Sequence, residues 1–276
     1  MRGYRIMGVV NVTPDSFSDG GEFLEPGAAI EHGLELVREG ADIIDVGGES
    51  TRPGAVPVGL EEELRRVLPV LEGLAAAGCA PRVSIDTSKA AVARAALELG
   101  VPLVNDVTAL EGDADMAGLI AAAGAQCCLM HTPPGSRDAG DAWECSDVVG
   151  AVKAYLAERL RFAVAAGIPE QRVLLDPGIG FGKSAEQSLE LLSRLDELTE
   201  LGRPIVVGTS RKRFLGWVAA GAAGLDRPLA VEARLPGTIA TNVLALERGA
   251  SVFRVHDVAP VRDALALAAA TLAAHG

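Results

Sequence analysis

The chain has 276 residues, of which 49% are hydrophobic and 4% aromatic, and its 25 Lys and Arg against 37 Asp and Glu give a formal net charge of −12. This length suits one large barrel or two small domains, and the composition indicates a globular α/β protein rather than a disordered or fibrous one. The acidic balance argues against nucleic-acid or anionic-membrane partners, and neither a leader-like start nor a run of about 18 apolar residues occurs, so we expect a cytoplasmic protein.

Short apolar runs alternate with segments of helical period along the chain. The runs, which predict strands, cover 6–10, 43–46, 83–85, 103–104, 127–130, 173–175, 205–207 and 252–255. The segments that predict helices cover 26–40, 60–74, 88–100, 113–124, 147–167, 185–201, 230–249 and 258–274. This alternation predicts a parallel (β/α)8 TIM barrel, with residues 1–276 as a single domain. A doubly wound open sheet is the alternative, although no G-x-G-x-x-G follows the first run.

Local signals define some helices more closely. The clearest apolar face consists of Leu60, Leu64, Val67, Leu68, Leu71 and Leu74. We expect N-caps at Asp147, at Ser184 with Gln187 three residues later, and at Asp257 ahead of Pro260. The four cysteines, at 79, 127, 128 and 145, contain no C-x-x-C pair, so we expect free thiols.

Polar residues follow nearly every apolar run, at the strand ends where a parallel barrel builds its active site. In chain order they are Asn11, residues 48–54, Asp86 with Thr87, Asn105 with Asp106, His131, Asp176, residues 210–213, and residues 254–257. One polar residue at a strand end is usually a cap or a turn residue, and His131 stays open between a structural and a site role. Eight such groups in register predict one shared site.

These groups suggest a ligand with two different ends. Asp86, Asn105 and Asp176 suit a flat heterocycle with ring N–H and amino groups. Positive charge and donors suited to phosphate come from Arg52, Lys212, Arg254 and His256. The glycines at 47–48 and 178–182 would allow close backbone approach, although turn formation alone explains them equally well. The segment 14–21 is expected to form a lid.

Seven strings in this order, NVTPDSFSDGG, GGESTRPGA, SIDT, VNDV, DPGIGFGK, SRK and RVHDV, resemble the dihydropteroate synthases over residues 6–270. The resemblance implies a transferase of folate biosynthesis and a sulfonamide target. It would condense 6-hydroxymethyl-7,8-dihydropterin pyrophosphate with p-aminobenzoate to give 7,8-dihydropteroate and pyrophosphate. Family members are usually homodimers, and the Ala-rich segments 230–249 and 258–274 could supply the apolar face for one.

The resemblance also implies roles for single residues. Asn11 would ligate a Mg²⁺ held with the pyrophosphate. The groups around the tail would be Thr51, Arg52, Arg254 and His256, with Val255 beside them. The pterin ring would be held by Asp86, Asn105, Asp176 and Lys212. The p-aminobenzoate site would be lined by Phe17, Pro53, Phe181 and the segment from Ser210 to Arg213. The catalytic roles would fall to Asp86, Asp176, Lys212, Arg254 and His256.

One residue departs from the family pattern, because Arg213 stands where many members have Ser near the p-aminobenzoate carboxylate. Its guanidinium could bind the carboxylate, or backbone N–H groups of the following helix could do so while Arg213 points to solvent.

The resemblance places the difficult step at pyrophosphate departure, and a dissociative route through a pterin cation is our hypothesis. Asp176→Asn is then expected mainly to weaken pterin binding, and Arg254→Ala mainly to slow turnover. Two alternatives stay open: a pterin-binding methyltransferase domain, which would not need the cations, and a non-catalytic pterin-binding member.

Overall fold

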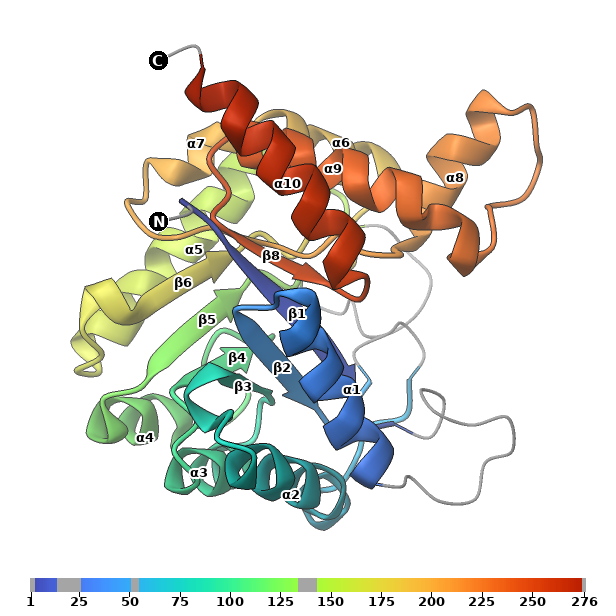
Figure 1. The fold of residues 1–276 in the computed structure, drawn as a ribbon. Helices are drawn as coiled ribbons and strands as arrows, with labels where there is room; N and C mark the ends of the chain where they lie inside the picture. Colours follow the sequence, from blue (N-terminus) through green and yellow to red (C-terminus); the bar gives the residue numbers. More distant parts are fainter. Residues whose placement is uncertain (1–2, 14–25, 51–54, 134–142, 275–276) are drawn as a thin grey trace.

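The computed structural model describes residues 3–13, 26–50, 55–133 and 143–274. Their strands form one parallel sheet of eight in the order β6-β5-β4-β3-β2-β1-β8-β7, and a bridge between Leu175 and Ile205 joins its two ends (Figure 1). The strands are β1 (Arg5–Asn11), β2 (Ile43–Gly47), β3 (Val83–Asp86), β4 (Leu103–Asp106), β5 (Gln126–Met130), β6 (Val173–Asp176), β7 (Val206–Val207) and β8 (Val252–Val255). The predicted barrel is confirmed.

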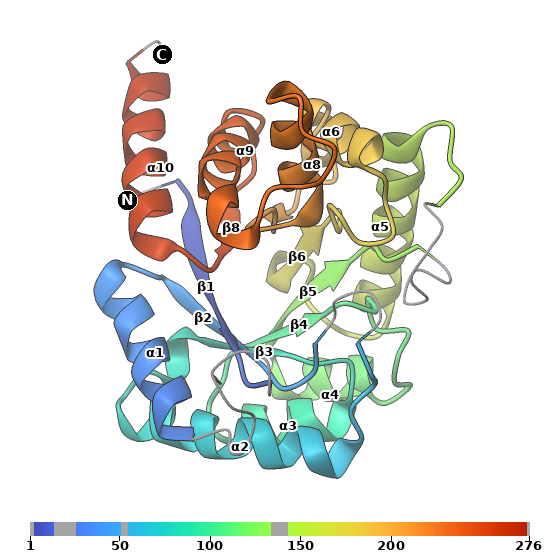
Figure 2. The ribbon, with the colours of Figure 1, turned by 90° about the vertical axis from the view of Figure 1, so that its right-hand side faces the viewer.

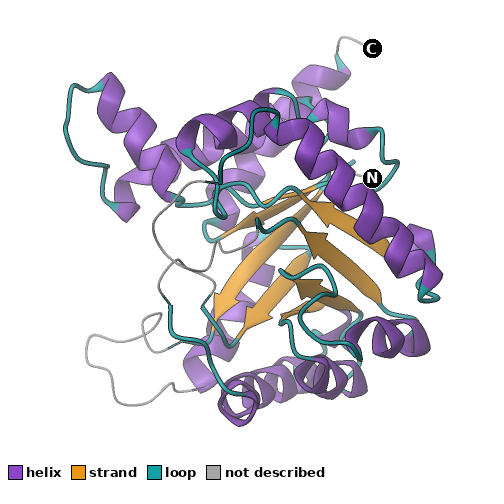
Figure 3. Cartoon of the chain, turned by 180° about the vertical axis from the view of Figure 1, so that it is seen from behind, coloured by secondary structure: helices purple, strands orange, loops and turns teal. Residues whose placement is uncertain are grey.

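Helices surround the strands on the outside (Figures 2 and 3). They are α1 (Pro26–Glu39), α2 (Leu60–Ala76), α3 (Ala90–Glu98), α4 (Met116–Ala123), α5 (Val148–Ala165), α6 (Ala185–Ser193), α7 (Asp196–Thr199), α8 (Arg213–Ala222), α9 (Leu235–Glu247) and α10 (Val258–Ala273). Three short 3₁₀ turns are η1 (Ala80–Arg82), η2 (Glu170–Arg172) and η3 (Val231–Arg234). No helix in the described ranges is long and apolar enough to cross a membrane.

The inside of the barrel is layered. One buried layer is entirely apolar and consists of Met7, Ile43, Leu103, Cys128, Leu174, Val206 and Val252. Since side chains alternate along a strand, the residues two positions later also face inward. These include Asp45, Asn105, Asp176 and Arg254. A polar layer therefore lies above the apolar one, toward the carboxyl ends of the strands.

The three predicted N-cap residues all lie at the N-cap positions of their helices. The Asp147 carboxylate accepts a hydrogen bond from the Gly150 N–H at 3.1 Å, and Ser184 and Gln187 form a reciprocal capping box. The Asp257 side chain makes no cap hydrogen bond. It pairs instead with the Arg211 guanidinium, at 2.5 and 3.0 Å.

The helix predicted over 185–201 is broken in two. Its apolar spacing continues through Leu195 and Leu198, so the pattern cannot show a break. The structure ends α6 at Ser193, whose carbonyl accepts a hydrogen bond from Arg248 at 2.9 Å, and begins α7 at Asp196. The first turn of the predicted 230–249 helix is 3₁₀, and α8 was absent from the helices that periodicity predicts.

The buried face of α2 begins at Glu63 and not at Leu60, where the prediction placed its first residue. Leu60 is 38% exposed, whereas Glu63 is fully buried beside Val67 and Leu71. The four cysteines are free as expected, with those at 127 and 128 buried.

Candidate active site

The described strand-end residues gather at one mouth of the barrel, at the carboxyl ends of the strands. Four predicted residues, Phe17, Thr51, Arg52 and Pro53, and the predicted lid over 14–21 lie outside the described residues. Gly47 shows how closely the strand ends pack here, because a Cβ on it would lie 3.3 Å from the Cβ of Asp86. Asn11 is the register partner of Gly47 on the other side.

Arg254 ties the polar layer together. Its Nε donates to Asp45 Oδ2 at 2.7 Å, and one terminal nitrogen donates to Asp86 Oδ2 at 2.8 Å. Asp45 Oδ2 also accepts from Asn105 Nδ2 at 3.0 Å. From its charge, Arg254 was predicted to lie with the phosphate-binding cations, apart from Asp86. That separation was wrong, because β8 and β3 both point these side chains into the barrel.

Burial and charge set the ionisation of this cluster. Burial raises the pKa of Asp86 to about 7, Arg254 opposes that rise, and the charge of Asp45 adds to it. Burial alone would lower the pKa of the Arg254 guanidinium, but Asp45 and Asp86 raise it. The arginine therefore stays charged, while Asp86 can gain or lose a proton near neutrality.

The loop after β6 wraps around Lys183. Its ammonium donates to the carbonyl oxygens of Gly178 at 2.9 Å, Phe181 at 3.2 Å and His131 at 3.3 Å. Gly178 has φ +63°, and a Cβ there would lie 2.0 Å from the His131 carbonyl oxygen, so only glycine fits. Close approach, and not turn formation alone, explains this glycine.

Asp176 fastens the start of the same loop, since its Oδ1 accepts from the Gly178 N–H at 2.7 Å. Burial raises the pKa of Asp176, and the nearby Lys212 lowers it. Burial also lowers the pKa of Lys183 to about 7. The loop thus combines a buried acid with a buried amine.

Lys212 lies beside Asp176, as the resemblance implied, and not apart from it with the phosphate-binding cations. Its ammonium donates to the Ile179 carbonyl and lies 4.3 Å from the centre of the Phe181 ring. Burial lowers the pKa of Lys212 to about 7, which the charge of Asp176 opposes. A half-buried cation and an aromatic face are thereby combined at this side of the mouth.

Ser210 and His256 form a pair between the ends of β7 and β8. The Ser210 hydroxyl contacts His256 Nδ1 at 2.9 Å and accepts from the His256 backbone N–H at 3.1 Å. Next to it, Arg211 has φ +58° and is fixed by Asp257. One ring nitrogen of the imidazole, Nδ1, is therefore fixed by Ser210.

Two predicted residues are placed differently from the rest. Val255 is fully buried in the core between barrel and helices, so its side chain does not line the mouth. Arg213 is exposed at the first position of α8, and its guanidinium lies 5.9 Å from the centre of the Trp217 ring. Of the alternatives left open for Arg213, this arrangement favours the solvent-facing one.

His131 belongs to the interior. It is 4% exposed and packs against Trp143 and Tyr155 with ring centroids 5.2 and 4.9 Å away. Burial lowers its pKa to about 3, helped by Lys183. This imidazole is neutral and packed between aromatic rings, while the His131 carbonyl oxygen contacts the β6 loop through Lys183.

A second buried network supports the loop after β2. Glu63 of α2 accepts from Thr87 Oγ1 at 2.6 Å and from the Lys89 ammonium. Lys89 also donates to Glu49 at 2.5 Å. These contacts connect the segment after β2 to the residues that directly follow Asp86.

Asn11 offers a hard oxygen donor at the half-exposed end of β1, the kind of ligand that Mg²⁺ accepts. No group of three or more His, Cys, Asp or Glu suited to a metal exists in the described part of the chain. The donor set thus fits a metal that takes most of its ligands from water or from a bound phosphate.

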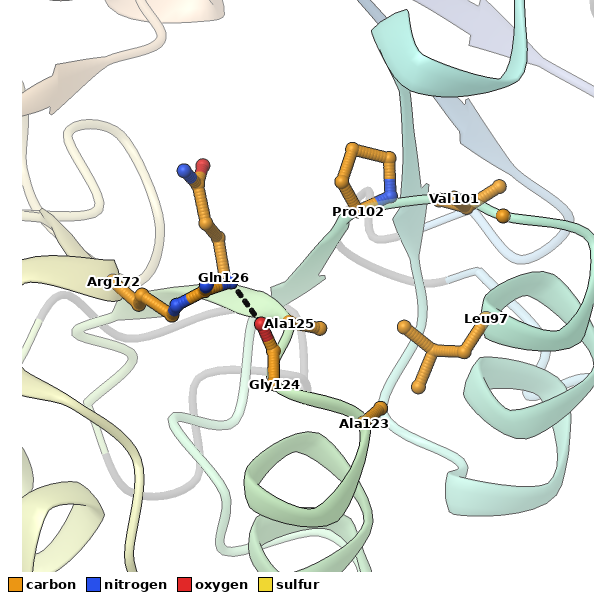
Figure 4. Close-up of a pocket in the computed structure, with 9 residues that line it drawn as sticks. Leu97, Val101, Pro102, Ala123, Gly124, Ala125, Gln126 and Arg172 are labelled. Atoms are coloured by element: carbon orange, nitrogen blue, oxygen red, sulfur yellow. Dashed lines mark hydrogen bonds between the residues drawn. The ribbon is translucent and has the colours of Figure 1, made fainter.

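A separate hollow of about 260 Å³ lies at the opposite, amino-terminal end of β4 and β5 (Figure 4). It is lined by Leu97, residues 100–102, residues 123–126 and Arg172. Arg172 donates there to the Gly124 carbonyl. None of the predicted site residues lines this hollow.

Asp45, Glu63 and Lys183 are among the buried charges that the sequence did not single out. Each carried a signal, since Asp45 interrupts an apolar run, Glu63 precedes Val67 by one helical turn, and Lys183 ends the DPGIGFGK string. A charge at a position that periodicity places inside marks a residue with a buried partner.

Comparison with known proteins gives consistent matches. Residues 7–256 match the family described as pterin binding enzyme. The dihydropteroate synthase of Mycobacterium leprae is 47% identical over 269 residues, covering 97% of this chain and 93% of the relative. The Escherichia coli enzyme of the same name is 40% identical over 271 residues, covering 98% and 92%.

Solved structures agree with these sequence matches. Xanthomonas albilineans dihydropteroate synthase with 4-aminobenzoic acid matches with a TM-score of 0.89 and 47% identity, covering 98% of this chain and 93% of that one. The same enzyme in complex with 7,8-dihydropteroate gives a TM-score of 0.86 at 44% identity, covering 98% and 94%.

Proposed function

We propose that this chain condenses 6-hydroxymethyl-7,8-dihydropterin pyrophosphate with p-aminobenzoate. The chain belongs to the pterin binding enzyme family and, within it, to the dihydropteroate synthases. The products are 7,8-dihydropteroate and pyrophosphate, and the chain is a transferase of folate biosynthesis. The supporting observation is the polar layer at the carboxyl mouth, where Asp86, Asn105 and Asp176 lie around Arg254.

The acidic and amide groups suit the pterin ring. Carboxylates accept from ring N–H and amino groups, and the Asn105 amide can satisfy a further polar edge. The three residues are buried, with exposures of 8%, 5% and 7% for Asp86, Asn105 and Asp176. Their hydrogen bonds to a ring would therefore form away from competing water.

Bond changes in the reaction are simple. The arylamine nitrogen forms a C–N bond to the pterin methylene carbon, the C–O bond to pyrophosphate breaks with its electron pair, and the amine loses a proton to solvent. His256, together with Thr51, Arg52 and Arg254, would stabilise charge on the departing pyrophosphate. Because Arg254 lies within the acidic cluster, it would also connect binding of the pterin ring to departure of the pyrophosphate.

A bound Mg²⁺ would be held by Asn11 and the diphosphate, and it would supply charge stabilisation for the leaving group. The p-aminobenzoate would lie against the Phe181 ring and the segment from Ser210 to Lys212, with Phe17 and Pro53 as further contacts. Its carboxylate would accept from backbone N–H groups at the start of α8.

The dissociative mechanism, in which pyrophosphate departs before the amine attacks, can be tested separately. If departure precedes attack, positional isotope exchange in the diphosphate should occur without p-aminobenzoate. Absence of both exchange and pyrophosphate release under that condition would favour a concerted displacement.

We also propose that the protein is cytoplasmic and that each subunit is a single domain over residues 1–276. Two such subunits would form a homodimer. Free thiols at all four cysteines suit a reducing compartment. The last two helices pack on each other and carry the exposed apolar side chains Leu244, Leu267 and Leu272, which suit a two-fold interface. Sedimentation analysis tests the dimer.

The decisive experiment measures pyrophosphate and 7,8-dihydropteroate from purified protein supplied with both substrates and Mg²⁺. Equimolar release of the two products supports the proposal. Pterin binding without product would indicate a non-catalytic member. Methyl transfer from a methylated folate to a corrinoid protein, with no pyrophosphate released, would indicate the methyltransferase alternative.

A further inference from the structure

Asp45 lies inside the barrel in the middle of β2, where sequence analysis saw only an apolar run. Resting on the proposed function, we propose that Asp45 is a positioning residue for pterin recognition, which sets the orientation of the Asn105 amide and of the Arg254 guanidinium through one carboxylate oxygen. It would act through these two neighbours and not by touching the ligand.

The contacts define what Asp45 does. Its Oδ2 accepts from Arg254 Nε at 2.7 Å and from Asn105 Nδ2 at 3.0 Å, and its side chain is fully buried. Three strands that are far apart in the sequence, β2, β4 and β8, are joined by this single oxygen. Its other oxygen, Oδ1, makes no hydrogen bond within the described residues.

For Asn105 the consequence is a defined donor and acceptor pattern. An ionised carboxylate only accepts hydrogen bonds, so the NH₂ group of Asn105 must face Asp45. The amide oxygen is then turned away from Asp45. Asn105 can therefore offer an acceptor to a ring N–H or amino group, and the amide cannot flip without breaking a buried bond.

Arg254 is oriented in the same way. With Nε on Asp45 and one terminal nitrogen on Asp86, the planar guanidinium is held along one edge. Asp86 keeps a cation beside it, and that cation cannot rotate away without removing the counter-charge of Asp45. Asp45 thus fixes the distance between the ring-binding acid and its counter-charge.

A role in stability alone does not explain Asp45. The layer directly below is entirely apolar, and Ile43, two residues earlier on the same strand and face, belongs to it. Burying an ion pair costs desolvation energy that an apolar side chain would avoid, and an unpaired Oδ1 adds to that cost. A buried aspartate at this level is more easily explained by what it orients above it.

The test compares Asp45→Asn with Ser84→Ala. Ser84 is the register partner of Asp45 on β3, is fully buried, and its hydroxyl makes no hydrogen bond in the described chain. We expect Asp45→Asn to raise the KM for dihydropterin pyrophosphate by about tenfold or more, because the Asn105 amide loses its fixed orientation. The KM for p-aminobenzoate, measured with the pterin substrate saturating, should change less than about twofold. Ser84→Ala should leave both constants unchanged.

Several results would overturn the proposal. Equal changes in both KM values, or a fall in kcat alone, would show that Asp45 does not orient the ring-binding groups. If Asp45→Asn does not fold by circular dichroism, Asp45→Glu keeps the charge but displaces it by one methylene, and an unchanged pterin KM in that variant is equally contrary. Wild-type protein is assayed first, so a lack of product there would contradict the proposed function and not the role of Asp45.

Discussion

The ammonium of Lys183 lies 2.9 Å from the carbonyl oxygen of Gly178, five residues earlier in the same loop. Two further carbonyls share this donor, so the lysine holds the loop after β6 much as a bound cation would. Because Asp176 begins this loop and Phe181 lies within it, the contacts of Lys183 help to position both the buried carboxylate and the aromatic ring.

Replacing this ammonium should loosen the loop. Lys183→Met is expected to lower the free energy of unfolding by about 2 to 3 kcal/mol, because three carbonyls lose a buried donor. Urea denaturation measures the change. The matched control is Lys153→Met, which removes a partly exposed ion pair with Glu200 and should cost less than about 1 kcal/mol. Equal losses in the two variants would contradict the role given to Lys183.

Arg254→Ala should affect more than turnover. The substitution leaves Asp45 and Asp86 buried without their counter-charge, so we expect the free energy of unfolding to fall by about 3 to 5 kcal/mol. Turnover should fall as well, as sequence reasoning predicted. Thermal unfolding and steady-state kinetics measure both effects, and Arg254→Lys should recover part of the stability. A variant with wild-type stability and reduced kcat would instead show that Arg254 acts in turnover alone.

Asp86 should make stability depend on pH. Its ordinary pKa of 3.8 rises to about 7 in the folded protein, so the folded chain binds more protons than the unfolded chain between these values. The free energy of unfolding should therefore fall as pH rises through that window. His131 has a lowered pKa and acts in the opposite direction, so Asp86→Asn must be compared with wild type at each pH. A difference between the two that does not vary with pH would contradict this ionisation.

The same ionisation should appear in the activity. Because the ionised Asp86 is the better acceptor for a pterin, kcat/KM for the pterin substrate should decline as pH falls below about 7. Lys212→Arg serves as the control, since burial lowers the pKa of Lys212 to about 7 and arginine keeps the charge without titrating in this range. Loss of the acidic limb in Lys212→Arg would reassign it to the Lys212 amine.

Arg213 should be dispensable for p-aminobenzoate binding. Its side chain is exposed and lies near Trp217, along α8, so Arg213→Ser is expected to change the KM for p-aminobenzoate by less than about twofold. Steady-state kinetics at saturating pterin substrate measure this. An increase of tenfold or more would mean that the guanidinium binds the carboxylate.

Removing the metal should stop turnover and leave the fold intact. EDTA is expected to abolish product formation, and added Mg²⁺ should restore it, because the proposed Mg²⁺ would take most of its ligands from substrate oxygens. Asn11→Ala should then raise the Mg²⁺ concentration needed for half-maximal rate. Circular dichroism in EDTA should be unchanged, and unfolding there would indicate a structural metal instead.

The amino-acid sequence by itself determined the strand order along the chain and the level at which the site lies. Strand ends are local features of the sequence. A polar residue that follows an apolar run therefore lies at the carboxyl end of its strand, however the helices pack. For this reason Asp86, Asn105 and Asp176 were found without coordinates, and the strings that carry them were enough to indicate the family.

Tertiary structure alone decided which of these groups are partners. Arg254 and Asp45 are 209 residues apart in the chain, and no local pattern connects them. The break between α6 and α7 and the carbonyl cage of Lys183 depend likewise on contacts from other segments. A hydrogen bond to a buried charge requires its two atoms to lie about 3 Å apart, whatever the number of residues between them in the chain. Such partners can therefore be identified only in the closed barrel.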